Sequence, residues 1–390
     1  MTPSTGIPRG VWMLGFVSLF MDVSSELIHS LLPVFMVVSL GATALMVGVV
    51  EGVAEGTALI VRVFSGTISD WLGKRKGLTV LGYGLGAVSK PLFALALTVH
   101  WVFVARFMDR IGKGIRGAPR DALIADLTPP EIRGAAYGLR QSLDTIGAFV
   151  GPLLAIALMV LWAGDFRAVF WFAVIPAVLS VLILIFGVQE PHAGGAHARP
   201  ASPVHWRSLS EFSGDYWWIV VAGGVFTLAR FSEAFLILHA QQLGLAVSLV
   251  PLVLVVMNLV YALSAYPSGR LADRMSHKKL LAAGLVVLIL ADIVLAQARG
   301  LAAVGAGVAL WGLHMGMTQG LLSAMVAGAA PAHLRGTAFG FFNLVSGVAM
   351  LIASVLAGLL WDELGASVTF YAGAAFSMLA LAMLILRRGS

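Results

Sequence analysis

Long apolar runs constrain this sequence more than any other feature. A helix needs about 20 apolar residues to cross the hydrocarbon core of a bilayer, and the chain contains about twelve runs of roughly that length or more. They lie at approximately 11–39, 44–68, 77–97, 100–125, 134–162, 167–188, 216–242, 247–271, 279–298, 301–327, 336–361 and 367–387. Only 11% of the 390 residues are charged, whereas a soluble domain carries roughly 25%. Lipid must therefore surround most of the chain.

The apolar runs predict helices rather than strands. In lipid, backbone groups must be hydrogen-bonded within their own segment, which a helix achieves. Strands of a membrane barrel alternate apolar and polar residues, and residues 249–260 show no such alternation. We therefore predict an all-α integral membrane protein with about twelve transmembrane helices. The first run follows a short polar start and is too long for a signal-peptide core, so we expect it to be retained as the first helix.

Lysine and arginine collect in every second connection between the runs. These connections hold Lys74, Arg75, Lys76, Arg133, Arg199, Arg207, Arg274, Lys278, Lys279, Arg335, Arg387 and Arg388. Cytoplasmic loops of membrane proteins carry such an excess, so we expect these loops and both termini on the cytoplasmic side. Topology thus explains the net charge of +6, and no nucleic-acid partner is expected. Cysteine is absent, which excludes disulfides and thiolate metal sites.

An internal repeat spans half of the sequence. Residues 66–76 and 269–279 share a Gly-x-x-x-Asp pattern followed by basic residues, and residues 129–138 resemble residues 331–340. The two offsets are nearly equal, so we predict two six-helix bundles at 1–188 and 216–390, related by a pseudo-twofold axis. The residues between them, 189–215, are rich in Pro, Gly, Ala, Ser and His, and we expect them to form a cytoplasmic linker.

The two Gly-x-x-x-Asp loops resemble the signature loop of the major facilitator superfamily. The resemblance is carried by Gly66, Asp70, Gly73, Lys74, Arg75, Gly269 and Asp273. In the second copy Ser276 replaces a glycine. The resemblance implies the major facilitator fold and transport by alternating access. These loops, with Arg133 and Arg335 of the other repeated motif, are then expected to form a conformational latch; the alternative is a basic loop that only sets the topology.

A glycine and proline motif lies in the fifth run. Gly147, Gly151 and Pro152 resemble the Gly-x-x-x-Gly-Pro motif of proton-coupled antiporters in this superfamily, although Ala155 and Ile156 stand where that motif prefers glycines. Gly147 and Gly151 share one helix face and permit close packing, while Pro152 is expected to bend the helix. The resemblance implies an exporter. Ordinary use of Gly and Pro in a membrane helix is the alternative.

Ionisable residues inside the runs are candidate functional sites, because a charge in lipid is costly. The first run contains Asp22 and Glu26 four residues apart, so their side chains share a face, and His29 follows one turn later. The other candidates are Glu51, Glu55, Arg62, Arg106, Asp109, Arg110, Lys113, Arg116, Arg120, Asp121, Arg140, Asp144, Arg230, Glu233, Asp292 and His314.

The closely spaced carboxylates predict a proton-coupling site. Neighbouring carboxylates repel each other, and desolvation also favours the neutral form. Asp22 with Glu26, or Glu51 with Glu55, is therefore expected to hold a proton near neutral pH and to release it when the cavity opens. The alternative is that an acid is only a structural partner of a nearby base. That interpretation is favoured for three acids with an arginine within one turn: Asp109, Asp121 and Asp144.

The fourth run also resembles superfamily antiporters. Arg106 and Arg110 are similar in place to a buried arginine of their fourth helix, which tunes the proton site. We therefore assign proton coupling or substrate contact to Asp22, Glu26, Glu51, Glu55, Arg110, Arg140, Asp144 and Glu233.

Two classes of cargo stay open. The aromatic residues of the runs, together with a few acids, suit an amphipathic organic compound or drug, exported as protons move inward. The alternative is a divalent metal of the nickel, cobalt or iron type, with His29, His314 and Met317 as ligands. The sequence contains no phosphate-binding Gly-Lys-Ser/Thr loop and no His-Glu-x-x-His, so we expect no enzyme activity and no cofactor. We expect a monomer in a bacterial-type inner membrane, with the lipid bilayer, protons and a small-molecule or ion substrate as partners.

Overall fold

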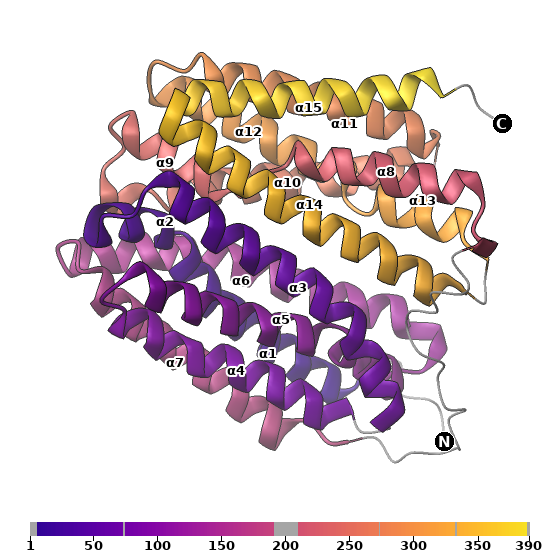
Figure 1. The fold of residues 1–390 in the computed structure, drawn as a ribbon. Coiled ribbons are helices and arrows are strands. Elements are labelled where there is room, and N and C mark those ends of the chain that lie inside the picture. Colours follow the sequence, from indigo (N-terminus) through magenta and orange to yellow (C-terminus); the bar gives the residue numbers. More distant parts are fainter. Residues whose placement is uncertain (1–5, 73–74, 191–209, 273, 332–333, 388–390) are drawn as a thin grey trace. The chain divides into compact units, whose positions relative to one another are not determined.

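The computed structural model describes residues 6–72, 75–190, 210–272, 274–331 and 334–387, apart from the side chains of Thr67 and Asp70. These residues form helices joined by short turns, and they contain no strand (Figure 1). By their contacts they divide into two compact units, unit 1 with residues 1–29 and 60–203 and unit 2 with residues 30–59 and 204–390. The predicted all-α fold is therefore confirmed.

Unit 1 contains the helices of the first half of the chain. They are α1 (Arg9–His29), the second part of α3 (Ala44–Leu72), α4 (Arg75–Leu95), α5 (Val99–Leu127), α6 (Arg133–Leu161) and α7 (Phe166–Gly187). Helix α1 packs against α6 and α7, and α4 packs against α5 and α7. Small polar side chains begin two of these helices, because Thr98 accepts a hydrogen bond from the Trp101 N–H and Asp165 accepts two from the first turn of α7.

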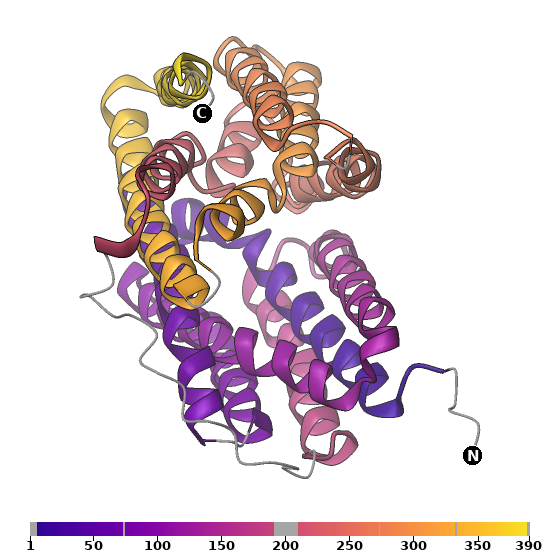
Figure 2. The same cartoon turned by 90° about the vertical axis from the view of Figure 1, so that its right-hand side faces the viewer.

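Unit 2 contains the remaining helices and the first part of α3. They are α2 (Leu32–Val34) with the π-helical segment Phe35–Ser39, α8 (Gly214–Leu228), α9 (Ala234–Gln242), α10 (Leu252–Ala272), α11 (His277–Ala296), α12 (Leu301–Thr318), α13 (Leu321–Ala329), α14 (Arg335–Leu364) and α15 (Ala366–Leu386). Figure 2, turned by 90° from Figure 1, shows α15 (yellow) nearly end-on. Helix α8 packs against α14 and α15, and α11 packs against α12 and α15.

The packing pattern of unit 2 repeats that of unit 1. The pairs α1–α6, α1–α7, α4–α5 and α4–α7 correspond in chain order to α8–α14, α8–α15, α11–α12 and α11–α15. Equal neighbours in equal order are what a duplicated six-helix sequence produces. The predicted boundaries at residues 188 and 216 stay a prediction, since the contacts place residues 30–59 with the second half and make α3 common to both units.

Most helices follow the apolar runs to within a few residues, although the runs 11–39 and 301–327 are each divided, after His29 and after Thr318. Ten helical segments of the described chain are long and apolar enough to cross a membrane. The two predicted segments outside this set have clear causes. Helix α5 carries five basic and three acidic residues along its 29 positions, and the run 216–242 is divided into α8 and α9 by the non-helical residues around Arg230. Both exceptions are places where polar groups enter the bundle.

Candidate functional site

Acidic residues of α1 lie where α1 crosses the glycine motif of α6. A Cβ atom added at Gly147 would lie 2.9 Å from the Cβ of Asp22, and one added at Gly151 would lie 2.8 Å from the Cβ of Glu26. Both helices present these residues at a spacing of four, so each acid meets one glycine. The structure thus brings together two predicted groups, the α1 acids and the α6 glycines. The missing glycine side chains are what lets the two backbones approach this closely.

Basic residues of α5 lie within electrostatic reach of the α1 acids. The positive charges of Arg116 and Lys113 attract the carboxylate of Asp22, and those of Lys113 and Arg110 attract the carboxylate of Glu26. Glu26 also contacts the ring of His29, with 3.4 Å between its Oε2 and the Nδ1 atom. Neither acid is fully buried, since both α1 side chains keep partial exposure. Two acids and several bases therefore share one polar region inside a membrane bundle.

A second set of ion pairs links α5 and α6. Arg140 pairs with Asp144 on the same face of α6, as their spacing predicts. Arg120 contacts Asp121 at 3.1 Å and Asp144 at 4.0 Å, and its guanidinium also donates to the hydroxyl of Ser18 on α1 at 3.0 Å. The pairing expected for Asp121 and Asp144 is present. Since Asp144 also acts electrostatically on Asp22, this network borders the α1 acids.

Lys90 is a buried partner that the sequence reasoning did not single out. Its ammonium group lies 2.8 Å from the Asp109 carboxylate and 3.0 Å from the Ser25 hydroxyl, and its side chain is 1% exposed. Arg106 and Arg110 each approach the same carboxylate at 3.9 Å. The available signal was a single lysine inside an otherwise apolar run. Asp109 is paired, as predicted, although its shortest contact comes from α4 and not from its own helix.

The remaining predicted acids lie in unit 2. Glu51 is fully buried in the first part of α3, and Glu55 is partly buried one turn later. Glu233 precedes the first residue of α9 and acts electrostatically on Arg230. These three acids thus belong to a different unit from the α1 acids. Their coupling role stays a prediction.

The predicted latch is described only in part. Gly73, Lys74 and Asp273 lie outside the described residues, as does the side chain of Asp70. Where the chain is described, Gly66 packs on α5, and Gly269 has open space around it.

The basic residues of the latch motifs differ in their contacts. Arg75 pairs with Asp126 at 3.0 Å, and its backbone N–H donates to Glu190 at 2.8 Å. Arg133 donates to the Thr128 carbonyl at 3.4 Å, while Arg335 is exposed at the start of α14. Arg75 therefore ties the start of α4 to the ends of α5 and α7.

The predicted metal ligands divide between the two units. His29 belongs to unit 1, whereas His314 is buried in unit 2, where its Nδ1 atom lies 2.8 Å from the Gly284 carbonyl oxygen. Met317 packs near the same glycine. Within the described residues, no group of three or more His, Cys, Asp or Glu side chains lies close enough together to hold a metal ion. The metal role of these three residues stays a prediction.

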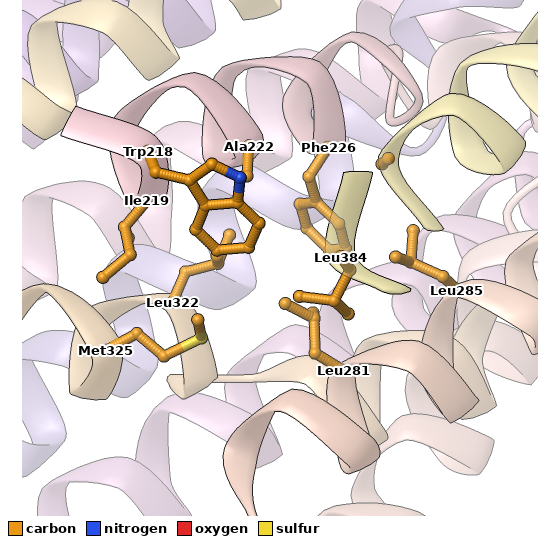
Figure 3. A pocket seen from close by; sticks show the side chains of 10 residues that line it. Trp218, Ile219, Ala222, Phe226, Leu281, Leu285, Leu322, Met325 and Leu384 are labelled. Carbon is orange, nitrogen blue, oxygen red and sulfur yellow. The ribbon is translucent and has the colours of Figure 1, made fainter. Parts of the chain in front are cut away.

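A separate pocket in unit 2 is almost entirely apolar. Figure 3 shows its lining, which comes from α8, α11, α13 and α15 and includes Trp218, Phe226, Leu281, Met325 and Leu384. Solute sites combine apolar walls with a few polar groups that orient the ligand. The side chains in Figure 3 offer one indole N–H, so we place the candidate site in the polar cluster of unit 1.

Comparison with known proteins gives a consistent result along the whole chain. The profile of the Major Facilitator Superfamily matches residues 14–238 and 230–390. The MFS-type transporter MJ1317 of Methanocaldococcus jannaschii is 29% identical over 97% of this chain and 95% of its own length. The multidrug resistance protein MdtH of Photorhabdus laumondii is 30% identical over 42% of this chain and 39% of its own.

Solved structures of low sequence identity share the fold. A crystal structure of peptide transporter POT has a TM-score of 0.82 at 15% identity, covering 98% of this chain and 96% of its own. The human organic anion transporter MFSD10 has a TM-score of 0.69 at 18% identity, covering 96% and 99%. The fold expected from the two signature loops is therefore confirmed.

Proposed function

Because the chain belongs to the Major Facilitator Superfamily, we propose that it is a proton-coupled antiporter that exports a small amphipathic organic compound by alternating access. The observation that carries the proposal is the meeting of Asp22 and Glu26 with the two α6 glycines beside the bases of α5. Carboxylates in a membrane bundle that neighbour bases and remain partly exposed suit reversible protonation.

The surroundings of the two acids support an exchange mechanism. When the polar region is open to water, hydration and the bases of α5 favour the ionised acids. A bound organic compound that donates hydrogen bonds to the ionised carboxylates stabilises the ionised form, so protons and substrate compete for the two acids. Competition of this kind makes proton entry release the substrate. The likeness to a multidrug resistance protein in part of the chain is in keeping with export.

The charge of α5 favours a cargo that carries negative charge. The helix holds five basic residues against three acidic ones, and Arg116 is 5% exposed with its guanidinium stacked over the ring of Tyr83 at 4.7 Å. An anionic group on the cargo would balance this excess, while a divalent cation would add to it. A structural relative is an organic anion transporter.

The place of the protein in the cell belongs to the same proposal. The alternation of basic loops supports cytoplasmic termini, and a multi-pass bundle of this kind fits a bacterial inner membrane. The polar cluster of unit 1 is built from helices of a single chain, which supports a monomeric transporter.

Transport by purified protein in liposomes tests the proposal. A panel of fluorescent organic anions and cations is added outside liposomes whose lumen is acidic. In the molecules whose cytoplasmic side faces outward, we expect anions to enter the lumen while protons leave it. Asp22→Asn and Glu26→Gln should each lower this exchange at least tenfold. Glu131→Gln, an exposed acid in the turn before α6, is the matched control and should leave exchange intact. Exchange that is unchanged in both α1 variants would reject the assignment.

A further inference from the structure

Asp292 is a buried acid that has no role in the coupling mechanism proposed above. It lies on α11, four residues before the last residue of the helix, and it is 0% exposed. Neither of its carboxylate oxygens has a hydrogen-bond partner in the part of the chain that the structure describes. An ionised carboxylate in such a place has lost its hydration without compensation, which is strongly unfavourable. The group must therefore be neutralised.

The space around the carboxylate is closed. A Cβ atom added at Gly373 on α15 would lie 2.8 Å from Oδ2 of Asp292 and 3.0 Å from the ring of Phe231. Phe231 in turn packs against Trp311 and Phe370, with ring centroids 5.4 and 5.7 Å away. A metal ion needs several oxygen ligands at short distance, and a hydrated cation needs more room than this aromatic shell leaves. A proton is the cation that fits.

Among the described residues, no opposite charge faces the carboxylate from the helices packed against it. Helices α12 and α15 contain no Lys, Arg, Asp or Glu, and the one titratable residue of α12, His314, contacts Gly284 two turns away along α11. In the segment before α9, Arg230 and Glu233 flank Phe231 and act on each other. Helix α10 carries Arg270, near its far end.

His239 on α9 is the titratable side chain that lies beside this part of α11. Its Nε2 atom is 3.0 Å from the Leu295 carbonyl oxygen, one turn after Asp292, and its Nδ1 atom is buried without a hydrogen-bond partner among the described residues. Its ring packs against Trp361 and Phe370. Trp361 also lines an open pocket at this end of unit 2. His239 therefore contacts both a residue of this pocket and the turn of α11 that follows Asp292.

The repeat makes Asp292 equivalent in position to a residue of different chemistry in unit 1. The offset that relates Arg133 to Arg335 also relates Lys90 to Asp292. In unit 1 the lysine is neutralised by Asp109, but the position that corresponds to Asp109 in unit 2 is occupied by Trp311. Unit 2 thus keeps a buried polar group at this position and lacks the ion-pair partner.

We propose that Asp292 is a proton-binding site of unit 2, whose carboxyl group is neutral in the arrangement seen here and exchanges its proton through the His239 end of the unit during the transport cycle. The site is separate from the Asp22 and Glu26 cluster and adds a second proton-carrying position to the chain. It would respond to pH even in the absence of cargo.

Infrared spectroscopy of the full-length protein in lipid tests the neutral state directly. Wild-type protein should show the carbonyl stretch of a protonated carboxylic acid at a pH where free carboxylates are ionised, and Asp292→Asn should lose that intensity. Glu363→Gln removes an exposed acid of α14 and should not change the band. The same band in wild type and Asp292→Asn would overturn the proposal. No substrate is needed, so the result does not depend on the coupling role of Asp22.

Transport tests the exchange of the proton. Asparagine has the size of the neutral acid, so Asp292→Asn should keep the melting temperature of the wild type while lowering proton-driven exchange at least tenfold. Full exchange in this variant would overturn the role in the cycle. If the variant does not fold, the wild-type spectrum decides alone: persistence of the protonated band at alkaline pH supports a shielded acid, and its absence refutes one.

Discussion

Gly151→Ala is the sharpest test of the contact between α1 and α6. The added methyl carbon would lie 2.8 Å from the Cβ of Glu26, 2.9 Å from the Val23 carbonyl oxygen and 3.1 Å from the Leu27 nitrogen. Favourable carbon–carbon contacts lie at about 3.5–4.0 Å, so the helices must separate by about 1 Å. Two of the three atoms belong to the backbone, so a change of rotamer does not relieve the overlap.

The expected magnitude follows from two opposing effects. Overpacking of this kind costs about 1–3 kcal/mol, whereas alanine is about 1 kcal/mol more favourable than glycine inside a helix. Gly138→Ala on the same helix is the matched control, because nothing lies within 4 Å of its added Cβ. The control keeps the gain in helix propensity alone. The difference in stability between the two variants should therefore be about 1–3 kcal/mol.

Thermal unfolding in one detergent, followed by exchange in liposomes, measures both consequences. Gly151→Ala should melt several degrees below Gly138→Ala. It should also exchange at least tenfold more slowly, because Glu26 moves relative to the bases of α5. Equal melting temperatures and equal exchange in the two variants would refute the close α1–α6 contact as the basis of the site.

Two further stability predictions follow from single contacts. Asp109→Asn leaves the Lys90 ammonium buried without its carboxylate and should destabilise by about 3–5 kcal/mol; Lys90→Met should cost less, because two arginines at 3.9 Å still neutralise the acid. Thermal unfolding that ranks Lys90→Met as the worse variant would contradict this order. Asp362→Ala removes the acceptor of the first two backbone N–H groups of α3, at 3.0 and 2.8 Å, and should lower stability by about 1–2 kcal/mol. The control Glu363→Gln, at the exposed neighbouring position, should melt like wild type. Equal melting temperatures for Asp362→Ala and Glu363→Gln would show that the cap does not stabilise the helix.

The sequence predicted the helices well because a bilayer imposes a length and a polarity on each crossing. The same rule is weakest for α5, where residues such as Arg106 and Arg116 lower the hydropathy of a true bundle helix. That run was still predicted, because its ends are apolar and the alternation of basic loops requires an even number of crossings. The interruption around Arg230 was not predicted, since a short loss of helix inside an apolar run leaves no mark on composition.

The candidate site was predictable only in part. The spacing of Asp22 and Glu26 placed both acids on one face, and the spacing of Gly147 and Gly151 did the same for the glycines. Neither spacing identifies the partner helix, because residues more than 120 positions apart meet through tertiary packing. The ion pair of Lys90 was not predicted for the same reason. Its partner is on another helix, whereas spacing rules describe contacts within a helix.

The divergence between the repeats explains why a duplicated fold need not contain a duplicated site. Helix packing is preserved where small residues allow it: Gly82 meets α5 in unit 1, and Gly284, at the equivalent position, meets α12 in unit 2. Two turns away, the buried polar groups have changed from a lysine and aspartate pair to an aspartate without a hydrogen-bond partner among the described residues. Packing between helices constrains size and shape at each contact, whereas it leaves the charge of a buried group to be settled by local partners. In unit 1 the charge of the buried group is neutralised by an ion pair, and in unit 2 by the proposed bound proton. The two halves therefore respond to pH through different groups while sharing one helix packing.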